Sequence, residues 1–237
     1  MTTTQPAQRK PRHHKDPWDW FFSITFGVVL RFMVWLISAI FIAVIIELIG
    51  MVYVWGPEHS HDVLKTEISF LGSFNQNLLT GLYPGDIASV MVNWVDQWIS
   101  FFHLREISSA LASGAHNSAS LFASYGVEAF INTVFIFAVR LAVCMSAMTG
   151  FALVCLVAFI DGLVERDIRR ACGGIESAMI YHNTKRLVKP AIMLSFGIYM
   201  TSPFSIHPTL IFLPIMAAVG VSIFLLPNIL KNIKRIV

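Results

Sequence analysis

Long apolar segments constrain the fold of this chain more than any other feature. Residues 141–160 are twenty consecutive residues without a charged side chain, and residues 32–48 contain only one, Glu47. About 20 helical residues span a bilayer, and a chain in lipid must satisfy its own backbone hydrogen bonds. Only 13% of all residues are charged, about half the share typical of soluble domains. The sequence therefore predicts an all-α membrane protein with about four transmembrane helices.

The remaining apolar residues and the polar stretches divide the chain into seven parts. Residues 190–227 contain two short apolar runs on either side of a proline-bounded turn, Ser-Pro-Phe-Ser-Ile-His-Pro. They can cross the membrane fully or form a re-entrant hairpin. The predicted parts are a disordered basic tail (1–16), an aromatic interfacial segment with the first transmembrane helix (17–56), a helical outer loop (57–128), the second transmembrane helix (129–160), a basic helical platform (161–189), the tight hairpin of the third and fourth helices (190–227) and a basic tail (228–237).

The distribution of Lys and Arg predicts the orientation. Of seventeen basic residues, four lie in the N-terminal tail, six in the platform and three at the C-terminus, whereas the outer loop has two basic and seven acidic residues. Cytoplasmic loops carry the excess of Lys and Arg. We therefore expect a multi-pass protein of the bacterial inner (cytoplasmic) membrane, with both termini and the platform in the cytoplasm and the outer loop in the periplasm.

The outer loop contains a helix with an aromatic stripe. Apolar side chains recur at helical spacing from Ile87 to Phe102, with Trp94 and Trp98 at the centre, and Asp86 is placed to cap this helix. Such a helix can lie on the outer leaflet, pack on its neighbour or contact another subunit. Assembly into a homo-oligomer is therefore left open.

Two ionisable residues interrupt the apolar segments near their outer ends. Glu47 lies close to the end of the first segment and Arg140 just before the second. An ionisable side chain inside a membrane usually needs a partner. We hypothesise a Glu47–Arg140 pair that fixes the register of the two helices; in the alternative, each side chain extends to the interface by itself.

The sequence contains no recognisable catalytic or cofactor-binding motif. Gly173–Gly174 lacks the Lys-Ser/Thr of a phosphate-binding loop, and there is no His-Glu-x-x-His sequence. His59 and His61 alternate in a polar loop without a third anchored ligand, which favours surface residues over a metal site. We therefore expect no enzyme, no cofactor and no metal.

The platform carries a recognisable pattern. It reads Asp161-Gly162-Leu163, then Glu165-Arg166-Asp167-Ile168-Arg169-Arg170, then Gly173-Gly174-Ile175-Glu176-Ser177, then Tyr181-His182, Lys185-Arg186 and Pro190. This pattern resembles the membrane proteins of integrating conjugative elements that are encoded beside the TraD-like coupling ATPase of a type IV secretion apparatus. The family often has Arg where this chain has Ile175. The order of tails, anchors and loops is similar over most of the chain.

The resemblance implies a non-enzymatic inner-membrane accessory of conjugative DNA transfer that docks or regulates the coupling ATPase or another secretion subunit. The platform charges can equally be topological anchors near lipid phosphates. They are interleaved with acids, so we expect no direct nucleic-acid binding. The alternatives are a small transporter or channel subunit, or an exclusion or immunity protein acting through its outer loop. The residues proposed to face the partner are Arg166, Arg169, Arg170, Glu176, His182, Lys185 and Arg186.

Overall fold

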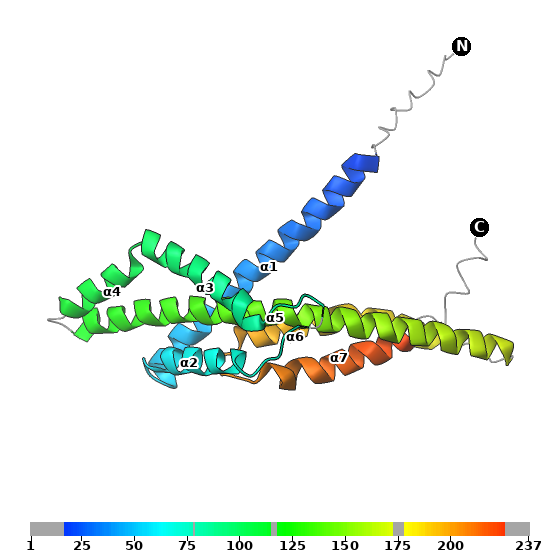
Figure 1. The fold of residues 1–237 in the computed structure, drawn as a ribbon. Coiled ribbons are helices and arrows are strands. Elements are labelled where there is room, and N and C mark those ends of the chain that lie inside the picture. Colours follow the sequence, from blue (N-terminus) through cyan, green and yellow to red (C-terminus); the bar gives the residue numbers. More distant parts are fainter. Residues whose placement is uncertain (1–16, 78, 115–117, 173–177, 226–237) are drawn as a thin grey trace, which may run out of the picture. The chain divides into compact units, whose positions relative to one another are not determined.

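The computed structural model describes residues 17–77, 79–114, 118–172 and 178–225 (Figure 1). Within these ranges it contains seven α-helices and no β-strand. Among the described residues, three helices include segments long and apolar enough to cross a membrane, namely Thr25–Tyr53, Ser118–Ile168 and Pro208–Leu225. The prediction of an all-helical chain with long apolar helices is confirmed for this part of the protein.

The chain divides into two units, residues 1–38 and 39–237. The described part of the first unit is the beginning of helix α1, Pro17–Tyr53. Its side chains from Phe26 onward are mostly apolar and exposed, and the rings of Phe32 and Trp35 stack with centroids 6.0 Å apart. Exposed apolar surfaces of this kind commonly mark sites of contact with a membrane or with another protein.

Helix α5, Ser118–Ala171, is the scaffold of the second unit. It packs against α2 (His59–Leu71), α3 (Pro84–Phe101), α4 (Leu104–Ser113) and α7 (Pro208–Leu225). No proline interrupts its 54 residues, so every backbone N–H after the first turn can donate within the helix. One element thus covers the predicted second transmembrane helix and the predicted beginning of the platform.

Helices α6 (Ala178–Thr201) and α7 form a hairpin closed by a turn at residues 202–207. Helix α6 continues through Pro190, although the sequence suggested one helix before this proline and an apolar run after it. Helix α7 packs on both α5 and α6. A Cβ atom on Gly220 would lie 3.0 Å from Val154 of α5, so a small residue lets these two helices approach closely.

In its described residues, the predicted outer loop contains α2, α3, α4 and the beginning of α5. On α2 the buried residues are Ser60, Val63 and Glu67, whereas Ile68 is half exposed. The cap assigned to Asp86 is wrong: Tyr83 is the N-cap residue of α3, and Asp86 lies in the first turn. The reason is that Pro84 takes a first helical position, where its missing N–H costs nothing.

The interior between α3 and α5 is a small cluster of apolar side chains. Ile99 packs against Ile131 and Phe135, with Val92 and Val95 at the edge of this cluster. The Trp and Phe stripe of α3 faces away from it. The sequence between residues 108 and 124, which fits either a flexible return or a helix, forms the end of α4 and the beginning of α5 in its described part.

Candidate functional site

A buried ion pair lies where α2, α5 and the α6–α7 turn meet. Nη2 of Arg140 lies 2.7 Å and Nε 3.0 Å from the same carboxylate oxygen of Glu67. Only 2% and 1% of these two side chains are exposed. Charges in such an environment interact strongly, and each depends on its partner because water cannot replace it.

The polar groups around the ion pair bind it to the hairpin. Arg140 donates from Nη2 to the carbonyl oxygen of Phe204 over 2.9 Å, and from Nη1 to that of Ser202. The Tyr199 hydroxyl donates to the second carboxylate oxygen of Glu67 over 3.2 Å. The guanidinium group thus joins a carboxylate of α2 to two turn carbonyls. We call Glu67, Arg140, Tyr199 and these carbonyls the latch.

Glu47, the partner hypothesised for Arg140, lies beside the latch. It is buried and lines one small cavity together with Arg140, Met200 and Pro203. The ion pair that the structure shows for Arg140 is the one with Glu67. The Glu47–Arg140 pair therefore stays a prediction, now with Glu67 as a second acid at the same place.

An aromatic cluster connects the end of α1 to the same turn. The ring of Trp55 lies 4.5 Å from that of His59 and 5.5 Å from that of Phe204, measured between centroids. It covers Gly50 so closely that a Cβ there would lie 1.8 Å from the indole. Nε2 of His59 lies 3.1 Å from the carbonyl oxygen of Pro203, so this histidine is part of the packing.

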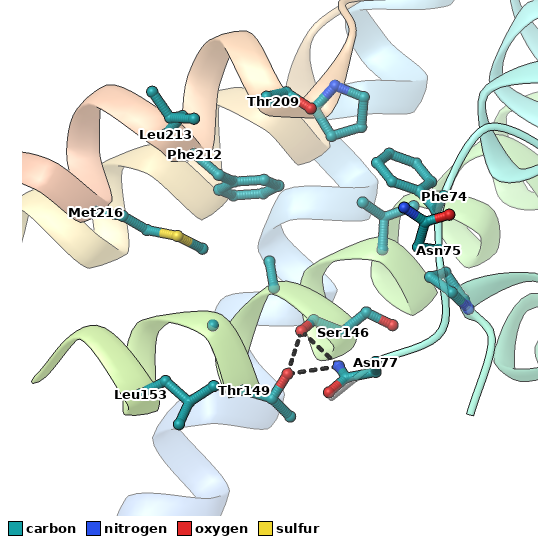
Figure 2. A pocket seen from close by; sticks show the side chains of 15 residues that line it. Phe74, Asn75, Asn77, Ser146, Thr149, Leu153, Thr209, Phe212, Leu213 and Met216 are labelled. Atoms are coloured by element: carbon teal, nitrogen blue, oxygen red, sulfur yellow. Dashed lines mark hydrogen bonds between the residues drawn. The ribbon is translucent and has the colours of Figure 1, made fainter. Parts of the chain in front are cut away.

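A groove of about 320 Å³ lies between α5, α7 and the loop that precedes α3 (Figure 2). Its walls are mostly apolar and include Phe212 and Met216. Asn77 enters its edge, where the side-chain amide donates to the carbonyl oxygen of Ser146 over 3.2 Å and to the Thr149 hydroxyl. One amide thus holds the loop against the part of α5 that carries no charge.

Most of the predicted platform set falls outside the described side chains. Arg166 is described, and its buried Nε has no hydrogen-bond partner among the described residues. Arg169 and Arg170 lie in α5, and His182, Lys185 and Arg186 lie in α6, but the side chains of these five residues are not described. Glu176 lies outside the described residues. Their role as a docking surface stays a prediction.

The geometry can hold helices together, and within the described residues no group of three His, Cys, Asp or Glu could bind a metal ion. Sequence reasoning missed Glu67, Tyr199 and Asn77. No sequence signal identifies Glu67, because the burial of the helical face that it shares with Ser60 and Val63 is seen only in the structure. Once that burial is known, the acid requires a basic partner.

Comparisons with known proteins indicate the family of this chain. A search of curated proteins and a search of solved structures each gave no match. Residues 54–231 match the model of a family described as "IncC plasmid conjugative DNA transfer protein DtrJ-like". The matched residues include α2 to α7 and therefore the whole latch. Because the match covers well over half of the chain, this protein belongs to the DtrJ-like family.

Proposed function

We propose that this protein is a non-enzymatic inner-membrane subunit of a conjugative DNA-transfer apparatus of the type IV secretion kind. The observation that carries the proposal is the match of residues 54–231 to a conjugative DNA transfer family. The three long apolar helices agree with a place in the membrane. The platform, residues 161–189, serves as the docking surface for the coupling ATPase.

The proposed topology has four transmembrane helices. Arg140 lies directly before the charge-free residues 141–160 and bonds to the turn of the hairpin. The hairpin turn therefore lies at the outer end of this apolar segment. This position supports two helices that cross the membrane fully and argues against a re-entrant hairpin. The apolar part of α6, Pro190–Thr201, is short, and residues before Pro190 would complete its crossing.

This topology brings the platform to the cytoplasmic side. The end of α5 and the beginning of α6 both lead into it, and it holds six of the seventeen basic residues. A coupling ATPase works on the cytoplasmic side, so an acidic surface on it could dock here through electrostatic complementarity. Reporter fusions test the orientation: alkaline phosphatase should be active when fused within residues 57–128 and inactive within 161–189.

A pull-down tests the docking function. The tagged protein is solubilised in mild detergent from cells that carry its conjugative element, and the wild type is expected to recover a large ATPase. A variant with Arg169, Arg170, Lys185 and Arg186 changed to Ala should insert normally but lose this partner. The matched control changes Lys231, Lys234 and Arg235, which are basic and on the same proposed side. Equal recovery by all three proteins would mean that the platform is only a topology signal.

A further inference from the structure

One face of α3 is a continuous exposed apolar surface made mostly of aromatic side chains. We call it the stripe; it consists of Val90, Trp94, Trp98, Phe101 and the C-cap residue Phe102. Between 49% and 72% of each of these residues is exposed. Trp98 is at its centre, with ring centroids 5.8 Å from Trp94 and 6.1 Å from Phe102. Exposed apolar patches of this kind usually mark an interaction site.

The register of α3 on α5 places the end of the stripe beyond the lipid. Pro84, at the start of α3, lines the groove beside Ser146 and Thr149, whereas Ile99, near its end, packs against Ile131. Helix α3 is therefore antiparallel to α5. Ile131 precedes Arg140 by nine residues, about 14 Å along a helix. With the outer edge of the hydrocarbon placed at Arg140, inside the 129–160 span predicted from sequence, an interfacial layer about 5–7 Å thick ends before the level of Ile131. On that placement lipid would not cover Trp98 to Phe102.

The stripe contains a hollow, and side chains beside that hollow could fill the same hollow on a second copy of the chain. A depression of about 320 Å³ lies among Trp94, Gln97, Trp98 and Phe101. Phe102 lies beside it, 57% exposed. In a two-fold symmetric contact the same patch is used by both copies, so each protrusion can enter the hollow of the other.

The exposed area and the charges agree with a contact between two copies. Aromatic side chains bury roughly 150–250 Å² each, so the stripe would contribute on the order of 500 Å² per copy and about 1,000 Å² in total, near the minimum for a specific interface. The stripe itself has no charged side chain. Asp96, on the same helix, is paired with Arg105 at 2.6 Å, which limits repulsion between like charges.

We propose that the stripe joins two copies of this chain through a symmetric α3–α3 contact on the outer side of the membrane. The choice of a second copy over lipid rests on the proposed membrane placement. The pairing itself can be read in purified protein and does not depend on recovery of an ATPase, so the two proposals can fail separately.

Cross-linking tests the contact in native membranes. In a background with Cys144, Cys155 and Cys172 changed to Ala, Trp98→Cys should give a disulfide-linked dimer in several-fold higher yield than Ser100→Cys. Ser100 is the matched control because it is exposed on the same helix, about half a turn away. Equal yields from the two cysteines would overturn the proposal.

Two measurements on purified protein identify the occupant. Light scattering in detergent should give the protein mass of two chains for the wild type and of one for Trp98→Glu/Phe101→Glu, at unchanged helicity. A monomeric wild type overturns the proposal. In that case, brominated lipids that quench wild type more than Trp98→Phe identify lipid as the occupant, and equal quenching indicates a different protein.

Discussion

Replacing Arg140 by Met should be among the most damaging single substitutions in this chain. The change leaves the carboxylate of Glu67, which is 1% exposed, without its cation, and the turn carbonyls of Ser202 and Phe204 without their donor. Breaking a buried pair on one side costs about 3–5 kcal/mol. For a chain of this size, we expect the midpoint of thermal unfolding to fall by roughly 6–20 °C.

A double-mutant cycle shows whether the loss comes from the pair. Thermal unfolding in detergent is followed for Arg140→Met, Glu67→Leu and the double variant. The double variant removes both charges, so it should be more stable than the sum of the single losses predicts, with a coupling of about 2 kcal/mol or more. Arg140 cannot lose its proton, so Glu67→Leu alone should also be strongly destabilising.

The same cycle with Glu47→Gln compares the two acids. Glu47 shares a cavity with Arg140, but the direct hydrogen bonds shown for Arg140 go to Glu67. We therefore expect a smaller coupling for Glu47. Additive losses in the Glu67 cycle, or a larger coupling with Glu47, would refute the assignment of the latch. A fold rescued by exchanging Glu47 and Arg140 would instead support the pair hypothesised from sequence.

Three smaller changes test neighbouring contacts by the same unfolding assay. Gly220→Leu should cost about 1–3 kcal/mol by overpacking against Val154, and a fully stable variant would show that α5 and α7 do not touch there. Asn77→Ala removes hydrogen bonds to Ser146 and to the Thr149 hydroxyl and should cost about 1–3 kcal/mol; no loss would mean that the loop is held otherwise. Tyr199→Phe loses one long hydrogen bond, about 1 kcal/mol, and a loss as large as that of Arg140→Met would contradict this.

The length of the apolar runs and the spacing of their residues were enough to predict the long helices from sequence. The run of twenty residues without charge lies within α5, and the proline-bounded turn closes the α6–α7 hairpin. Helix α6 differs from the sequence prediction because it continues through Pro190. A proline inside a membrane helix can be tolerated when neighbouring groups satisfy the backbone carbonyl that loses its donor. Local sequence around Pro190 does not report those neighbours.

The partners of the buried charges could not be predicted, because pairing is a property of the tertiary fold. Glu67 precedes Arg140 by 73 residues and stands among Lys65, Thr66 and Ser69, which suggest a polar surface. For the stripe on α3, the sequence left open contact with lipid, with a neighbouring helix or with another subunit. In the structure the stripe is exposed, while Ala88 and Ile99 on the same helix are buried. Hydrophobicity alone does not identify which face packs within one chain.

We expect the latch to influence the relative position of the two platform segments. Residues 161–171 are the last turns of α5, and residues 178–189 are the first turns of α6. Arg140 of α5 holds the turn at the far end of α6, and α7 packs between the two. Because helices transmit position as stiff rods, loosening the latch should alter the relative placement of the two platform segments.

Arg140→Met should therefore recover less ATPase in the pull-down even where it inserts normally at low temperature, whereas Tyr199→Phe should recover nearly as much as the wild type. Full recovery by an inserted Arg140→Met protein would mean that the platform is positioned independently of the latch.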